Sequence, residues 1–250
     1  MDSTVERIVN IMRDRYGERL YIPELAAEAF FSPFHFSRIF RRETGVAPGQ
    51  YLTAVRLFEA KRLLLSTSFN VADIACQVGY RGIGTFTTRF SAAVGCSPGQ
   101  YRRLPPDAML SYSDERCRIP DAASTPAPAS SDDTAATVVA VLPRTGGRRL
   151  FAGVFDSAVP QGSPSVWQVV DPAASPRVVL RDVAPGPHVL IVVEQQEHDV
   201  APPGVFVRPL HVAAGTVSKV DVRLRPAQRT DPPIMVSLGG EVALPQRLAM

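Results

Sequence analysis

Residues 25–51 read LAAEAFFSPFHFSRIFRRETGVAPGQY, and residues 74–101 read IACQVGYRGIGTFTTRFSAAVGCSPGQY. Both stretches end in Pro-Gly-Gln-Tyr, and the second ending lies 50 residues after the first. At the same offset, Phe36, Phe40 and Gly45 recur as the same residue types. A repeat at this period indicates one supersecondary unit that the chain uses twice.

Each copy reads as a helix, a short turn and a second helix. Apolar spacing predicts these helices at Pro23–Ala29 and Pro33–Thr44 in the first copy, and at Val71–Val78 and Gly82–Val94 in the second. Two helices joined in this way form a helix-turn-helix motif. The first part of the chain is therefore predicted to be all-α, with tandem helix-turn-helix units joined by a long helix over Pro48–Ser66.

Short-range signals mark where helices begin. Ser32 and Ser97 each precede a proline, which is the usual pairing of an N-cap with the first helical position. Gln100 follows Ser97 by three residues and completes a capping box. Asn70 is a further expected N-cap. An amphipathic helix is also predicted before the first copy, from the apolar stripe Val5, Ile8, Val9 and Met12.

Some residues are expected to serve packing rather than chemistry. One side of the long helix is predicted to carry Tyr51, Val55, Phe58 and Leu65. Cys76 is expected to be a small buried apolar residue, and Trp167 to lie in the core of a later domain.

The second helix of the first copy presents side chains suited to DNA. Those left outward or at its edges are Phe34, Ser37, Arg38, Arg41 and Arg42. Arginine can bind guanine through two hydrogen bonds, and serine can bond to base edges. Arg41 and Arg42, near the far end, suit phosphates. The plainer interpretation is a solvated helix face, but the repeat favours DNA because it fixes the geometry of these arginines.

The corresponding helix of the second copy is less basic. Thr85 and Thr88 are candidates for base contact, since a threonine methyl also packs on the methyl group of thymine. Arg81 and Arg89 are candidates for phosphate contact.

Residues 1–104 as a whole resemble the DNA-binding domain of the AraC/XylS family of transcriptional regulators, through both quoted stretches and the joining segment LTAVRLFEAKRLLL. The resemblance implies seven helices and binding to double-stranded promoter DNA. It places the base-reading positions on Phe34, Ser37 and Arg38 in the first copy, and on Gly84, Thr85 and Thr88 in the second. Gly84 departs from many members because it offers no side chain, so the second copy is expected either to read fewer bases or to bind mainly through backbone contacts. Members commonly place an effector domain before the DNA-binding domain, whereas here the DNA-binding domain comes first.

Composition divides the chain near residue 104. Only 4 of the 23 prolines fall in residues 1–104, which carry a net charge of +5. Residues 105–136 carry −4 and are rich in proline, alanine, serine and aspartate, which is typical of a solvated linker. Residues 137–250 carry +2. The sequence therefore predicts a DNA-binding domain, a linker and a second domain.

The last segment reads as short strands separated by turns rich in proline and glycine. The predicted strands are Val138–Leu142, Arg149–Phe155, Val166–Val170, Arg177–Leu180, His188–Val193, Val205–Val207 and a run within 216–224. Seven such strands suggest an all-β antiparallel sandwich. The phrases LRDVAPGPHVLIVV and VAAGTVSKVDVRL resemble transthyretin-like or carboxypeptidase-regulatory-like sandwiches.

Several classes of protein are disfavoured. No apolar run has the length of a membrane span, and the first residues lack the pattern of a signal peptide. Three cysteines with no metal-ligand spacing favour a reducing cytoplasm. No nucleophile elbow or phosphate loop supports an enzyme, and no cofactor is expected. A metal site is not expected, because the spacing of the candidate ligands fits no template; these are His188, His198, His211, Glu194, Glu197 and Asp199.

The sequence therefore predicts a cytoplasmic, non-enzymatic transcriptional regulator. RNA polymerase is an expected partner if the protein activates. The last domain has two open roles. It either senses a small molecule or recruits a protein as an adaptor, and the two differ in whether a closed apolar pocket or an exposed apolar patch is present.

Overall fold

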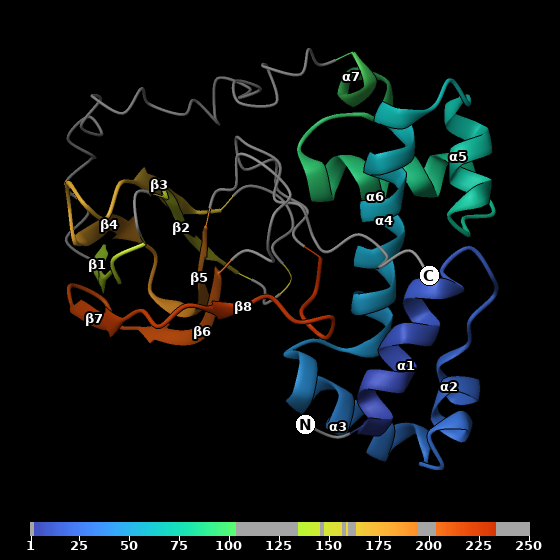
Figure 1. Cartoon of the computed structure of the whole chain (residues 1–250), viewed down its shortest axis with the longest axis horizontal. Helices are drawn as coiled ribbons and strands as arrows, with labels where there is room; N and C mark the ends of the chain where they lie inside the picture. The colour runs from blue at the N-terminus through green and yellow to red at the C-terminus, as the bar shows by residue number, and fades with distance from the viewer. Residues whose placement is uncertain are drawn as a thin grey trace. The chain divides into compact units, whose positions relative to one another are not determined.

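The computed structural model describes residues 3–103, 135–145, 148–156, 159, 164–194 and 204–233. It contains two compact units, one helical and one built of strands (Figure 1). Among the described residues, the helical unit comprises 3–103, Val159 and 228–233, and the β unit comprises the rest. None of the described helices is both long and apolar enough to cross a membrane.

Seven helices form the described part of residues 3–103. They are α1 (Ser3–Asp14), α2 (Ile22–Glu28), α3 (Pro33–Thr44), α4 (Pro48–Ser66), α5 (Val71–Gln77), α6 (Ile83–Val94) and α7 (Pro98–Arg102). The predicted stripe of α1 is confirmed, since all four of its residues are buried. The predicted N-caps are confirmed at Ser32, Asn70 and Ser97, and Gln100 closes the capping box with a bond from Ser97 N–H of 2.9 Å.

The same turn joins α2 to α3 and α5 to α6. In the first, the N–H of Phe30 donates to the carbonyl oxygen of Ala27 and the N–H of Phe31 to that of Ala26, both at 2.9 Å. The N–H groups of Gly79 and Tyr80 make the matching bonds after α5, also at 2.9 Å. This pair of bonds defines a Schellman motif, which needs a left-handed residue after the helix. Gly79 supplies it with φ of 84°, and Phe30 with φ of 58°.

Exchanging the residue types at these two turns should change stability in opposite directions. Phe30→Gly should raise the free energy of unfolding by about 0.5–1 kcal/mol, because glycine has no Cβ penalty at positive φ. Gly79→Ala should lower it by about 2 kcal/mol, since a Cβ there would lie 2.9 Å from the backbone oxygen of Tyr16. Chemical denaturation of both variants measures this. A loss of stability in Phe30→Gly would show that the exposed ring stabilises the fold.

An aromatic ladder recurs in both halves of the helical unit. Phe36 and Phe40 of α3 lead to Tyr51 of α4, with ring centroids 5.5 Å apart at each step. Their counterparts Phe86, Phe90 and Tyr101 follow at 5.6 Å. A cation from another helix faces each tyrosine ring. Arg13 of α1 lies 5.8 Å from the Tyr51 ring, and Lys61 of α4 lies 5.5 Å from the Tyr101 ring. The internal repeat of the sequence is thus a repeat of the core.

Helix α4 is buried on several sides, because it packs against α1, α3, α5 and α7. The single stripe predicted for it is therefore only half right. Tyr51 and Val55 are buried, but Phe58 is half-buried and Leu65 is exposed. The prediction for Cys76 is wrong, since its side chain is exposed on α5 while Cys96 is buried.

Eight strands form the described β unit. They are β1 (Ala136–Val141), β2 (Leu150–Phe155), β3 (Val166–Val170), β4 (Arg177–Val183), β5 (Gly186–Glu194), β6 (Gly204–Val212), β7 (Val217–Asp221) and β8 (Arg225–Pro226). Each of the seven predicted runs overlaps one of them. They make a three-stranded sheet, β4-β1-β7, and a five-stranded sheet, β3-β2-β5-β6-β8.

The two sheets enclose one apolar core. Val138, Leu180 and Val220 contribute from the small sheet, and Leu150 and Leu190 from the large one. The predicted antiparallel arrangement is wrong for one pair, because β1 and β7 run parallel. Periodicity of two predicts a strand but not the direction of its partner. Parallel neighbours need a long crossover, and the chain between β1 and β7 provides it.

Trp167 does not lie in this core. It pairs with Gly153 across the β2–β3 ladder, on the other face of the large sheet. Its ring stacks on Phe151 with centroids 5.8 Å apart. A Cβ at Gly153 would lie 2.9 Å from the Phe151 ring, so the glycine leaves room for this aromatic pair.

Candidate DNA interface

The ends and buried face of α3 determine which side it exposes. Phe36, Ile39 and Phe40 are buried. At its start, the hydroxyl of Ser32 accepts a hydrogen bond from the backbone N–H of His35 at 3.4 Å. At its end, Gly45 takes the left-handed conformation with φ of 80°. The opposite face of α3 is therefore held toward solvent.

Four of the five candidates on α3 are exposed, namely Phe34, Arg38, Arg41 and Arg42, and Ser37 is half-buried. They recur at helical spacing and lie on one stripe. Phe34 is 80% exposed, which is unusual for so large an apolar side chain. The hydroxyl of Ser37 donates to the carbonyl oxygen of Pro33 at 2.9 Å.

The arginine side chains of this stripe make only weak contacts with the rest of the protein. Arg38 Nη2 lies 3.3 Å from His35 Nδ1. Arg42 pairs with its neighbour Glu43 at 2.9 Å, and the Arg42 side chain stays largely exposed. Exposed pairs of this kind contribute little to stability. The guanidinium groups can therefore exchange these contacts for base edges or phosphates at low cost.

The candidates of the second copy are all exposed, namely Arg81, Gly84, Thr85, Thr88 and Arg89. No atom lies within 4 Å of a Cβ built on Gly84. Packing therefore does not require glycine at this position of α6. The exposed surface of α6 is smaller in its side chains and less charged than that of α3.

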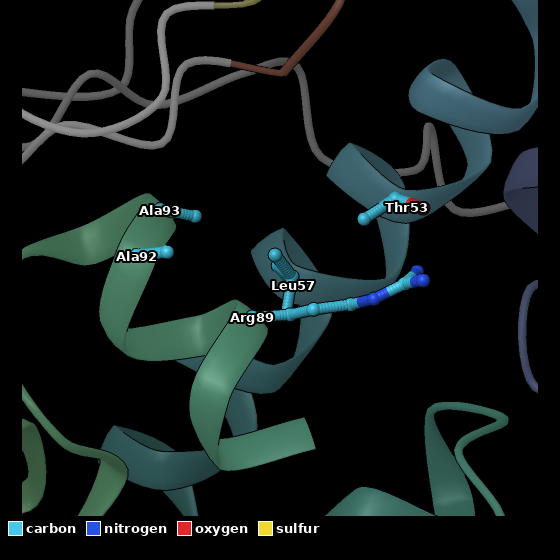
Figure 2. Close-up of a pocket in the computed structure, with 5 residues that line it drawn as sticks. All are labelled: Thr53, Leu57, Arg89, Ala92 and Ala93. Atoms are coloured by element: carbon cyan, nitrogen blue, oxygen red, sulfur yellow. The ribbon is translucent and has the colours of Figure 1, made fainter. Parts of the chain in front are cut away.

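Arg89 differs from the other candidates in where its side chain extends. Figure 2 shows it reaching from α6 toward α4, along a groove of about 250 Å³ that Thr53, Leu57, Ala92 and Ala93 also line. Burial raises the pKa of Tyr80, and the charge of Arg89 opposes that rise. Arg89 thus acts on the interior of the helical unit as well as facing solvent.

Sequence reasoning missed Ile83 at the start of α6. It is 51% exposed, although isoleucine is usually buried. At an offset of 50 residues it matches Pro33, so the repeat pointed to a helix-opening position. Ile83 directly precedes Gly84, the first predicted contact residue of α6, and this position is the signal that could have identified it.

The residues weighed for a metal site are only partly described. The ring of His188 on β5 has two polar contacts. Its Nδ1 lies 3.1 Å from Asp156 Oδ1, and its Nε2 lies 2.7 Å from the backbone oxygen of Ala184. His198, Glu197 and Asp199 lie outside the described residues. Within the described ranges, no group of three or more His, Cys, Asp or Glu side chains could hold a metal ion.

Comparison with known proteins identifies the helical unit. A family model described as a helix-turn-helix domain matches residues 25–104. The HTH-type transcriptional activator AarP of Providencia stuartii is 30% identical over 100 residues, which cover 40% of this chain and 74% of AarP.

This chain belongs to the AraC/XylS family of helix-turn-helix transcriptional regulators.

This AraC/XylS member is similar to other proteins over stretches of comparable length. The HTH-type transcriptional regulator Rv1931c of Mycobacterium tuberculosis is 42% identical over 91 residues, covering 36% of this chain and 35% of that protein. The matched part thus spans about a third of that curated relative. A crystal structure of the DNA-binding domain of AdpA, a global transcriptional factor, in complex with a target DNA is 33% identical. It covers 39% of this chain and 88% of that chain, with a TM-score of 0.39.

Proposed function

We propose that this protein regulates transcription by reading a specific promoter sequence with two recognition helices, α3 and α6. The observation that supports this most is the repeated geometry of the two helix pairs, which share their turn, their aromatic ladder and their exposed second helix. Two such helices can enter successive major grooves, about 34 Å apart on B-form DNA. The net charge of +5 on residues 1–104 favours the approach to phosphates.

In this proposal α3 supplies most of the sequence specificity. Phe34, Ser37 and Arg38 lie in its first two turns and contact base edges, with Phe34 suited to a thymine methyl group. Arg41 and Arg42 hold phosphates near the other end.

In the same proposal α6 reads fewer bases. Thr85 and Thr88 contact bases, while Gly84 brings the backbone close without a side chain. Arg81 and Arg89 hold phosphates. The open space around Gly84 supports this division, because packing would admit a larger side chain there.

Two arginine variants test the assignment on α3. Arg38→Ala should weaken binding to the preferred site by about 1–3 kcal/mol and relax specificity at one base pair, as expected for a lost base contact. Arg42→Ala should weaken binding to all sequences about equally and reduce the dependence of affinity on salt. The measurement is a binding titration on DNA selected from fragments of the source genome, repeated with single-base variants of that DNA.

Arg42→Ala is the matched control, because both residues are exposed arginines on the same stripe of α3. If Arg38→Ala also lowers affinity uniformly across sequences, Arg38 contacts only a phosphate. If the unmodified protein shows no sequence preference in the selection, the proposed function is wrong.

The β unit is assigned a regulatory role in this proposal, with RNA polymerase as a further partner if the protein activates. One observation favours the adaptor as a second candidate. Val141, Val179 and Val217 are exposed on the outer face of the three-stranded sheet. Exposed apolar side chains on one sheet face suit a protein partner. A small molecule that binds the β unit and changes affinity for the operator would favour a sensor instead.

A further inference from the structure

Residues 228–231 form a closed turn after the last strand. The N–H of Asp231 donates to the carbonyl oxygen of Gln228 at 3.0 Å. In return, the N–H of Gln228 donates to Asp231 Oδ2 at 2.7 Å. Thr230 within the turn is only 3% exposed. The turn, called the strap below, belongs to the helical unit although it lies far from that unit in sequence.

The strap bonds to α1 and α4 through its backbone. The hydroxyl of Tyr51 donates to the carbonyl oxygen of Arg229 at 2.7 Å. Arg13 donates from Nε to that same oxygen and from Nη2 to the carbonyl oxygen of Asp231, both at 3.1 Å. Arg229 Nη1 lies 3.3 Å from Asn10 Oδ1. Two carbonyl groups thus receive bonds from one guanidinium and one phenol, and bonds from a charged donor are the stronger kind.

Tyr51 connects the strap to the first recognition helix. Its side chain is fully buried, and its hydroxyl also accepts from Arg13 Nε at 3.0 Å. Its ring packs on Phe40, which packs on Phe36, and both belong to α3. A shift of the strap therefore changes the bonding of the residue on which the core face of α3 rests.

At its other end the strap continues into the β unit. Only Ala227 separates it from β8, which ends at Pro226 and pairs with β6. The strap is therefore the first part of the helical unit that the chain reaches after β8.

We propose that the strap is a built-in coupling element through which the β unit controls the first recognition helix. When bound to Arg13 and Tyr51, it holds α3 in the form that binds DNA. When the β unit withdraws it, α3 loosens and the operator is released. The part of this proposal that concerns DNA rests on the proposed function above.

Two variants of the full chain weaken the strap contact from opposite sides. Tyr51→Phe keeps the ring and deletes the hydroxyl that donates to Arg229. Asp231→Ala leaves the helices intact and opens the turn. Tyr101→Phe is the matched control, because it deletes the hydroxyl at the equivalent rung of the second ladder.

Hydrogen–deuterium exchange of the full chain measures the coupling without DNA. Loss of one or two hydrogen bonds should speed exchange of the amides in 228–231 and in α3 about three- to tenfold in both strap variants. Tyr101→Phe should leave both segments unchanged. Unchanged exchange of 228–231 in both strap variants would overturn the strap contact. Faster exchange of 228–231 with unchanged exchange of α3 would overturn the coupling.

DNA binding provides the second readout. Both strap variants should bind the selected operator about three- to tenfold more weakly than the unmodified chain. The control variant, Tyr101→Phe, is the one that keeps the exchange rates of the strap. Equal or tighter binding by the strap variants would overturn the proposed direction of control. If the unmodified chain binds no operator, the proposed function fails, and the exchange experiment still decides whether the strap holds α3.

Discussion

Phe40→Ala should lower the free energy of unfolding of the helical unit by about 3–5 kcal/mol, the usual cost of deleting a large buried aromatic ring. Phe40 is fully buried and forms the middle rung of the ladder between Phe36 and Tyr51. Its loss leaves a cavity beneath α3, so this helix should lose its fixed position. Chemical denaturation followed by circular dichroism measures the first effect, and operator titration the second.

Phe34→Ala is the control on the same helix. Phe34 is 80% exposed, so its truncation should change the free energy of unfolding by no more than about 0.5 kcal/mol. Operator affinity should nevertheless fall about tenfold, or 1.4 kcal/mol, if the ring contacts a base. A stability loss equal to that of Phe40→Ala would show that Phe34 belongs to the core. Unchanged affinity would remove Phe34 from the proposed contact surface.

Lys61→Met should remove a pH dependence of stability that spans about pH 8 to 10.5. Burial lowers the pKa of Lys61 from its usual 10.5 to about 8. In that window the unfolded chain binds a proton at Lys61 that the folded chain does not. The free energy of unfolding therefore rises with pH through the window, by roughly 3 kcal/mol in total, and methionine cannot show this rise.

The neighbours of Lys61 determine how the experiment is arranged. Burial raises the pKa of the Cys96 thiol, and the charge of Lys61 opposes that rise. Thiol ionisation would therefore lower stability at high pH, so Lys61→Met is best compared with its parent in a Cys96→Ala background. Tyr101, whose ring faces the Lys61 ammonium, is present in both chains. Denaturation midpoints that stay parallel from pH 7 to 10 would contradict the lowered pKa.

Most of the helical unit follows from local rules, and those rules are visible in the sequence. Serine before proline predicts the starts of α3 and α7. The repeat predicts that Phe36 and Phe86 occupy equivalent positions, as do Phe40 and Phe90. Where several neighbours share one helix, local rules fail. The stripe of α4 was half wrong because four helices pack around it.

Non-local features were not predictable from one sequence. Alternation placed the strands, but the parallel pairing of β1 with β7 depends on how the chain crosses between sheets. The apolar character of Trp167 predicts a place in the core, whereas strand register puts it on the other face of the sheet. Phe30 adopts the left-handed conformation that usually favours glycine, so no sequence pattern predicts it. The strap uses backbone carbonyl groups, which every residue has, and its sequence therefore carries no signal.

The pairing of β1 with β7 has a consequence for biosynthesis. The seven helices contact one another within residues 3–103, so they can form as soon as that part leaves the ribosome. Val138 of β1 cannot pair with Ser218 of β7 until residue 218 has also left the ribosome. At about 5–20 residues per second, the interval between the two events is about 6–23 s. A nascent chain thus completes its seven helices before the strap and the two sheets have formed, and a ribosome stalled in that interval would display the helices without them.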